Sequence, residues 1–181
     1  MRVAITAGGT GGHIFPALAI INKIKSHDKN SEFLYFGTTD RMEKDIIPER
    51  GIPYIAIPMK GLNRKQVWKN VTVLKIYLQA IKKAETELSK FKPDIVIGVG
   101  GYITAPVLVA AHRLGIKTLI HEQNSIPGVS NKLLSKFVDK ICISFKESET
   151  SFPKQKTVYT GNPRSEEILL MEKGNREDFG F

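Results

Sequence analysis

The first candidate site lies at residues 8–13, which read Gly-Gly-Thr-Gly-Gly-His and follow a short apolar run. Glycines let a backbone approach a phosphate closely, and the first turn of a following helix offers free N–H groups and a positive dipole end. The glycines do not fit the G-x-G-x-x-G dinucleotide fingerprint, and no Lys-Ser or Lys-Thr pair follows them as in a P-loop. The segment therefore predicts a phosphate cradle made of backbone amides.

A second segment of similar composition lies at residues 98–102, where Gly-Val-Gly-Gly-Tyr follows another apolar run. Either segment alone could be a tight turn whose glycines supply positive φ angles. Two glycine loops at neighbouring strand ends favour a different interpretation, because together they can hold a diphosphate between two backbone cradles.

The histidine that ends the first segment, His13, is a candidate general base. A lone histidine is more often structural than catalytic, but His13 follows four glycines at the expected ligand edge. A helix N-terminus disfavours a cation, so we expect a neutral imidazole that can accept a proton. His27 and His112 fall in helical patterns and are expected to be structural or exposed.

Residues 121–128 form a third polar segment, which begins His-Glu-Gln-Asn at the end of an expected strand. Glu122, Gln123 and Asn124 offer paired hydrogen-bonding groups suited to sugar hydroxyls. For His121 we favour a buried polar network that orders the loop. No metal site is predicted, because the chain has no Asp-x-Asp, paired Cys or His-x-x-x-His pattern.

The elements that must position these segments alternate between short apolar strands and amphipathic helices. We expect strands at residues 3–6, 32–36, 54–57, 94–97, 117–121, 140–144 and 157–160, and helices at 16–25, 41–47, 65–90, 105–114 and 130–137. This alternation predicts an α/β fold with a Rossmann-like parallel sheet and helices on both faces. Ligands of such sheets bind beyond the carboxyl ends of the strands, so the three segments and a fourth at 161–164 should converge on one rim.

Composition excludes several classes of protein. The 181 residues are 41% hydrophobic, too many for a disordered chain, and the single cysteine excludes a disulfide-rich miniprotein. No secretory signal is visible, and the uncharged stretch at 95–112 contains three glycines and a proline, which argues against a membrane span. We expect a soluble or peripheral protein. The polar tail at 172–181 suggests a domain boundary, with one domain at 1–163 and an interdomain segment from 164.

Positive charge is concentrated in the expected long helix. Residues 60–92 hold nine Lys or Arg and two acids, so nine minus two gives +7 of the chain's net +9. The apolar stripe expected to face the sheet comprises Val67, Val71, Leu74, Leu78, Ile81 and Leu88. On the other side we predict a membrane patch of Trp68, Lys69, Lys75 and Ile76. A solvated face is the plain alternative, and nucleic acid is disfavoured because the aromatics form no stacking platform.

Four motifs in this order resemble the MurG family of glycosyltransferases. They are Gly-Gly-Thr-Gly-Gly-His-Ile-Phe-Pro-Ala from residue 8, Gly-Val-Gly-Gly-Tyr-Ile-Thr-Ala-Pro from 98, His-Glu-Gln-Asn-Ser-Ile-Pro-Gly from 121 and Thr-Gly-Asn-Pro from 160. The similarity covers nearly the whole chain. It implies the N-terminal, acceptor-side domain of a GT-B fold, with a C-terminal domain that supplies most of the nucleotide-sugar pocket lying outside this chain.

The resemblance also implies roles for individual residues. His13 would be the catalytic base, and Glu122 and Gln123 would support the acceptor sugar. Donor-contacting positions would be Thr10, Gly11, Gly12, Asn124 and Arg164, and the acceptor diphosphate would lie against Gly9, Gly11, Gly12, Gly100, Gly101 and Tyr102. One departure concerns Arg164, which directly follows Pro163 where the family usually has an apolar residue in between. That departure leaves the role of Arg164 open.

For function, the resemblance implies inverting transfer of N-acetylglucosamine from UDP-GlcNAc to the 4-hydroxyl of the muramoyl sugar of lipid I, giving lipid II for peptidoglycan synthesis. The implied partners are UDP-GlcNAc, lipid I and an anionic membrane surface, with no cofactor and no nucleic acid. The implied location is peripheral, on the cytoplasmic face of the bacterial cell membrane. Two alternatives stay open: a stand-alone phospho-ligand binding module, and a membrane-recruiting subunit of a two-chain glycosyltransferase.

Overall fold

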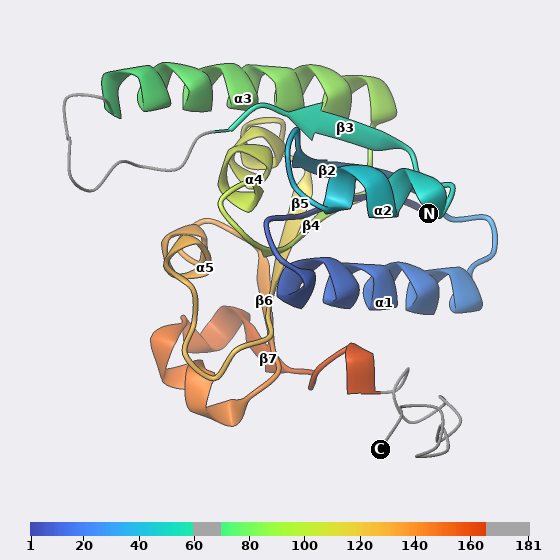
Figure 1. Ribbon diagram of the computed structural model, residues 1–181. Coiled ribbons are helices and arrows are strands. Elements are labelled where there is room, and N and C mark those ends of the chain that lie inside the picture. Colours follow the sequence, from blue (N-terminus) through green and yellow to red (C-terminus); the bar gives the residue numbers. More distant parts are fainter. Residues whose placement is uncertain (60–69, 166–181) are drawn as a thin grey trace, which may run out of the picture.

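Seven parallel strands form one sheet in the order β3-β2-β1-β4-β5-β6-β7 (Figure 1). The computed structural model describes residues 1–59 and 70–165, with the side chains of residues 70–72 left out. The strands are β1 (Arg2–Ala7), β2 (Glu32–Thr38), β3 (Tyr54–Ile57), β4 (Ile95–Gly100), β5 (Lys117–Glu122), β6 (Lys140–Ile143) and β7 (Thr157–Tyr159). The α-helices are α1 (Gly11–His27), α2 (Glu43–Glu49), α3 (Asn70–Phe91), α4 (Thr104–Arg113) and α5 (Val129–Leu134).

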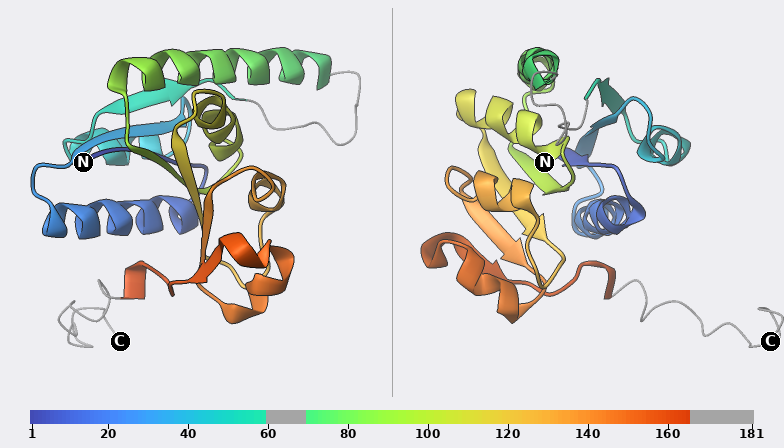
Figure 2. Two further views of the ribbon diagram at one scale, coloured as in Figure 1. Left: turned by 180° about the vertical axis from the view of Figure 1, so that it is seen from behind. Right: turned by 60° about the vertical axis from the view of Figure 1, so that its left-hand side comes forward.

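Helices cover both faces of this sheet, as the apolar strand runs predict. One face carries α1 and α2, while α3, α4 and α5 lie on the other, as the right-hand view of Figure 2 shows. Alternate side chains of β1 supply the two cores: Val3 and Ile5 pack with α1, and Ala4 packs with α3 and α4. The prediction of a Rossmann-like parallel sheet between two helical layers is therefore confirmed.

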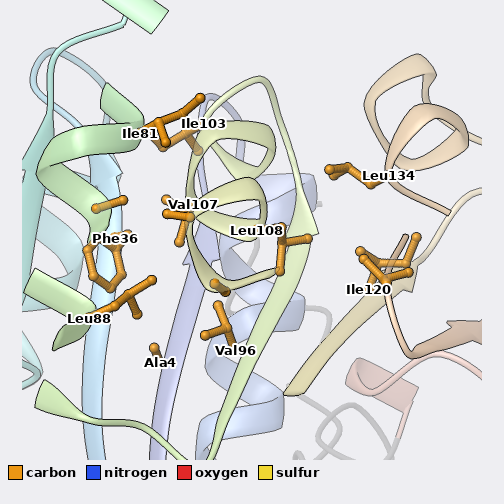
Figure 3. Packing of buried hydrophobic residues seen from close by; sticks show 14 of the residues in the cluster. Ala4, Phe36, Ile81, Leu88, Val96, Ile103, Val107, Leu108, Ile120 and Leu134 are labelled. Atoms are coloured by element: carbon orange, nitrogen blue, oxygen red, sulfur yellow. The ribbon is translucent and has the colours of Figure 1, made fainter. Parts of the chain in front are cut away.

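The larger core lies between the sheet and the α3–α4 layer. Phe36 and Leu88 lie close together at one end of it, with Val107 and Leu108 of α4 towards the middle (Figure 3). All four side chains are fully buried. At about 25 cal/mol for each Å² of apolar surface removed from water, side chains of this size dominate the folding free energy. This packing fixes α4 over β4 and so sets where the loop between them lies.

Among the element boundaries that differ from the sequence predictions, two lie at the glycine loops. Helix α1 begins at Gly11, five residues before the expected start, because the Thr10 carbonyl accepts the N–H of His13 and of Ile14 and so closes a first turn. Strand β4 continues to Gly100, so Gly98 is a strand residue and not part of a loop. A Cβ at Gly98 would lie 2.4 Å from Cγ2 of Thr104 and 2.8 Å from Cδ1 of Leu108, so glycine permits α4 to pack on β4.

The face that α3 buries also differs from the prediction. Leu74 and Leu78, which were expected to face the sheet, are 59% and 53% exposed. Ile81 and Leu88 of the expected stripe are buried as predicted, but they are joined by Ala80 and Ala84, with Val73, Ile76 and Tyr77 half-buried. Small side chains let α3 approach its neighbours closely, and this rotates the helix away from the stripe that the large apolar residues suggest. Val67 of the expected stripe lies outside the described residues.

We expect Gly98→Ala to lower the free energy of unfolding by about 1–3 kcal/mol, because the added methyl overpacks the α4–β4 contact. Urea unfolding followed by circular dichroism measures this change. Gly12→Ala is the control, since a Cβ there meets its nearest neighbour, Thr10 Oγ1, at an ordinary 3.7 Å. Equal stability of the Gly98→Ala variant and the wild type would contradict the packing role of Gly98.

Candidate functional site

The loop between β1 and α1 presents unpaired amides at the carboxyl edge of the sheet. Thr10 precedes the helix in an extended conformation, and its carbonyl takes the N–H groups of His13 and Ile14 at 3.0 and 3.2 Å. Within the described residues, nothing accepts the N–H groups of Gly11 and Gly12. These two donors at the N-terminus of a 17-residue helix form the kind of cradle that binds an anion.

The second glycine loop touches the first, backbone to backbone. Gly100 and Gly101 have φ angles of +112° and +87°, which strongly favour glycine. A Cβ on Gly101 would lie 2.3 Å from the carbonyl oxygen of Gly8, and one on Gly100 would lie 2.5 Å from Cδ2 of His13. The two loops therefore interlock only because these positions carry no side chain, and the structure brings the predicted loops together.

His13 lies between the two loops, in the first turn of α1. Its Nδ1 is 3.1 Å from Oγ1 of Thr10, and its ring rests against Gly100. Burial lowers the pKa of His13 below its ordinary 6.5, while the negative charge of Glu122, the Gly8 backbone and the charge of Glu43 oppose that shift. The imidazole is therefore predominantly neutral near pH 7 and can accept a proton.

Glu122 ends β5 and holds the third segment in place. Its carboxylate is 1% exposed and accepts four hydrogen bonds, of 2.9 to 3.0 Å. The donors are the N–H and side-chain amide of Asn124, the N–H of Gly128 and the side-chain amide of Asn131. A carboxylate has about four lone pairs that can accept hydrogen bonds, and these four donors occupy them. Glu122 therefore orders the loop and has no lone pair left for a direct hydrogen bond to a sugar. Its predicted support of the acceptor can act only through that loop.

The neighbouring amide side chains differ in their availability. Asn124 is exposed and gives its Nδ2 to Glu122, which leaves its Oδ1 open to a ligand. Gln123 is half-buried, with its Oε1 unpaired within the described residues. Asn131, 3% exposed, was not predicted, and its amide also donates to the carbonyl of His121 at 3.4 Å. The sequence signal for Asn131 was a polar residue on the buried side of the helix expected at 130–137.

These segments enclose one pocket of about 210 Å³. It is lined by His13, Gly100, Gly101, Tyr102, Glu122, Asn124, Gly128, Val129, Ser130 and Asn131. The catalytic candidate, the second glycine loop and the amide-bearing loop thus share one cavity, as the convergence of strand ends predicts. Within the described residues, no group of three or more His, Cys, Asp or Glu side chains is arranged to hold a metal ion.

The fourth segment lies beside α1, outside this pocket. The guanidinium of Arg164 stacks over the Phe15 ring at 5.0 Å, and the backbone N–H of Arg164 donates to Oδ1 of Asn162 at 3.0 Å. Next to it, His121 is 3% exposed, with Nε2 3.3 Å from the carbonyl of Gly161. His121 therefore ties the fourth segment to β5, in agreement with its predicted part in a buried network.

Only two of the four residues of the predicted membrane patch lie within the described residues. Trp68 and Lys69 lie outside the described residues. Lys75 is exposed on α3, whereas Ile76 is half-buried and therefore does not belong to a fully exposed face.

We expect the free energy of unfolding to fall as the pH drops from 7 to 5. Burial lowers the pKa of both His13 and His121, so below about pH 6.5 the unfolded chain binds more protons than the folded one. Urea unfolding at each pH measures the slope. His121→Gln should reduce it, because the glutamine amide can still donate to Gly161 without titrating. A wild-type stability that is flat over this range would contradict the burial of both rings.

Comparison with known proteins agrees with this geometry. Residues 3–143 match the glycosyltransferase family 28 N-terminal domain. The UDP-N-acetylglucosamine–N-acetylmuramyl-(pentapeptide) pyrophosphoryl-undecaprenol N-acetylglucosamine transferases of Bacillus licheniformis and Bacillus subtilis are 51% and 48% identical to the chain, over 96% and 100% of its length. The crystal structure of Acinetobacter baumannii MurG superimposes with a TM-score of 0.77 at 32% identity, covering 89% of this chain and 46% of that one.

The chain spans about half the length of the curated relatives it matches, 48% and 50% of the two Bacillus proteins. The matched family model covers most of the strands, both glycine loops and the pocket they enclose. The resemblance read from the four sequence motifs is confirmed. The chain belongs to glycosyltransferase family 28, and it carries the N-terminal domain of that family.

Proposed function

We propose that the chain is the N-terminal, acceptor-binding half of an inverting glycosyltransferase. The reaction moves N-acetylglucosamine from UDP-GlcNAc to the 4-hydroxyl of the muramoyl sugar of lipid I, giving lipid II for peptidoglycan synthesis. The names of the Bacillus relatives support the donor and the lipid-linked acceptor. The acceptor domain spans residues 1–163, residues from 164 begin the interdomain segment, and a C-terminal domain completes the donor pocket.

The observation that carries this proposal is the pair of interlocked glycine loops. The free N–H groups of Gly11 and Gly12 come from one loop, and Gly101 and Tyr102 line the pocket from the other. Amides at a helix N-terminus suit a phosphate, and we infer that the backbone of the second loop contacts the other phosphate of a diphosphate. Lipid I carries its diphosphate between the prenyl chain and the muramoyl sugar, so the sugar of a bound molecule lies close to His13.

His13 acts as the base in this proposal. As the acceptor hydroxyl attacks the anomeric carbon of the donor, His13 takes the hydroxyl proton. The new bond forms between the acceptor oxygen and the anomeric carbon, while the bond from that carbon to the UDP oxygen breaks and UDP leaves with its electrons. Attack opposite the leaving group inverts the configuration. Oδ1 of Asn124, at the same pocket, is placed to accept a sugar hydroxyl.

A membrane-facing surface on α3 supports a lipid-linked acceptor. Leu74 and Leu78 are highly exposed, and the exposed Lys75 and Lys82 lie beside them at helical spacing. Exposed leucines flanked by lysines suit the interface of an anionic bilayer. None of the helices within residues 1–59 and 70–165 is long and apolar enough to cross a membrane. The location we propose, on the strength of the exposed leucines and lysines and of the lipid-linked acceptor named for the relatives, is peripheral, on the cytoplasmic face of the cell membrane.

Two other functions would be supported by different results of the tests below. A stand-alone phospho-ligand binding module would bind diphosphate without contributing to sugar transfer. A membrane-recruiting subunit would bind vesicles and leave catalysis to another chain. A C-terminal half that restores transfer when joined to this chain favours the glycosyltransferase over both.

We expect His13→Ala to lower the transfer rate by about 10²- to 10⁴-fold, the usual contribution of a general base. The assay uses this chain joined to the C-terminal half of the Bacillus subtilis relative, with UDP-GlcNAc and a lipid I analogue. The unmodified hybrid is the positive control, and the 181-residue chain alone is expected to transfer no sugar. Near-normal turnover by a folded His13→Ala hybrid would remove His13 from catalysis.

We expect the pair Leu74→Ser and Leu78→Ser to weaken binding to anionic vesicles by about tenfold or more, because each leucine loses apolar burial in the interface. Co-sedimentation with phosphatidylglycerol-containing vesicles measures this. Leu114→Ser is the matched control, since Leu114 is 40% exposed at the end of α4 and away from the α3 leucines. Unchanged vesicle binding by the double variant would make the α3 face an ordinary solvated surface.

A further inference from the structure

Glu43 is a fully buried acid directly behind the first glycine loop, and the reaction described above does not use it. It is the first residue of α2 and 0% exposed. Its Oε1 accepts the N–H and the hydroxyl of Thr38 at 3.1 and 2.7 Å, and its Oε2 accepts the N–H of Gly9 at 3.3 Å. Within the described residues no Lys or Arg pairs with it. A buried charge without a cation must be stabilised by such donors.

The chain leaves room for this carboxylate on two sides. A Cβ at Gly8 would lie 2.5 Å from Oε1 of Glu43, and a Cβ at Gly37 would lie 2.8 Å from its Cγ. Tyr35 and Tyr54 tie the same two segments from behind, with hydroxyls that donate to the carbonyls of Ala7 and Thr38 at 3.0 and 2.6 Å. Glu43 therefore belongs to a packed assembly that connects the β1–α1 loop with the end of β2.

The hydrogen bond from Gly9 divides the amides of the first loop into two groups. Gly9, with φ of +92°, turns its N–H inward to Glu43, whereas nothing within the described residues accepts the N–H groups of Gly11 and Gly12. Gly9 was predicted to lie against the diphosphate, but its N–H already has an acceptor in the protein, the Glu43 carboxylate. On its other side, the same loop is held by the contact between the Gly8 carbonyl and Gly101.

We propose that Glu43 is a positioning residue for anion binding: it clamps the Gly8–Gly9 backbone against the second glycine loop, so that the Gly11 and Gly12 amides face the diphosphate. This inference rests on the proposed function for the identity of the ligand. Glu43 cannot touch that ligand, because it is fully buried behind the loop. Its influence passes through the conformation of Gly9.

The negative charge of Glu43 and its clamp on the first glycine loop have opposite effects on anion affinity, which makes the proposal testable. A negative charge behind the cradle repels a bound anion, so loss of the charge alone should tighten anion binding. Loss of the clamp lets the loop sample other conformations, and ordering it again on binding weakens affinity. The sign of the change in affinity therefore distinguishes a positioning residue from a charge that only tunes the electrostatic potential.

The first experiment measures inorganic pyrophosphate binding to the 181-residue chain by NMR titration. We expect Glu43→Gln to weaken binding by about tenfold, because its amide cannot accept the Gly9 N–H while its oxygen still faces Thr38. Glu43→Asp, which keeps the charge and shortens the reach, should weaken binding similarly. Glu49→Gln removes an exposed acid from the other end of α2 and should leave affinity unchanged. Tighter binding by Glu43→Gln with no change for Glu43→Asp would overturn the positioning role.

A second measurement needs no variant and covers the case in which a Glu43 variant fails to fold. In the ligand-free wild type, the Gly9 amide should exchange with solvent more slowly than the Gly11 and Gly12 amides. Equal exchange of all three would overturn the proposal, because the clamp would be absent. If pyrophosphate shifts none of the Gly11, Gly12, Gly101 or Tyr102 amides, the proposed diphosphate site fails, while slow exchange at Gly9 still supports the clamp itself.

Discussion

The rim depends on one backbone contact, between the carbonyl oxygen of Gly8 and Gly101. No Cβ fits at Gly101, where it would lie 2.3 Å from that oxygen, and the φ of +87° also favours glycine. The contact joins the loop before α1 to the loop before α4, so His13 in the first turn of α1 and Tyr102 shortly before α4 line the same pocket. His13 fills the remaining gap against Gly100, and the pocket follows from this arrangement.

The sequence predicted the features that depend on local pattern and missed those that depend on partners distant along the chain. Alternating apolar runs and amphipathic stretches are local, so the parallel sheet and the convergence of the loops were expected and found. The predicted buried face of α3 was right for Ile81 and Leu88 and wrong for Leu74 and Leu78, because the small Ala80 and Ala84 are buried in their place. Glu43 and Asn131 were missed because their partners are backbone and side-chain groups that only the fold brings near.

Two buried carboxylates stabilise a site whose expected ligand is also an anion. Glu43 holds the first glycine loop and Glu122 holds the third segment, each through hydrogen-bond donors in place of cations. Both carboxylates favour the imidazolium form of His13 and so oppose the effect of burial on its pKa. The acids that order the loops thereby limit how far burial lowers the pKa of His13.

The topology also explains why the exposed leucines of α3 and the glycine loop before α1 share one edge of the sheet. Each crossover helix runs back against the direction of its strands, so the N-terminal turns of the helices gather at the carboxyl edge of the sheet (Figure 1). Leu74 and Leu78 lie in the N-terminal half of α3, and Gly11 and Gly12 open α1. In the lipid-linked diphosphate proposed as the acceptor, the prenyl chain is bonded directly to the phosphates, so that ligand calls for an apolar surface and an anion-binding loop at the same edge of the molecule. A parallel βαβ sheet directs the N-terminal turns of both helices to that edge without any additional element.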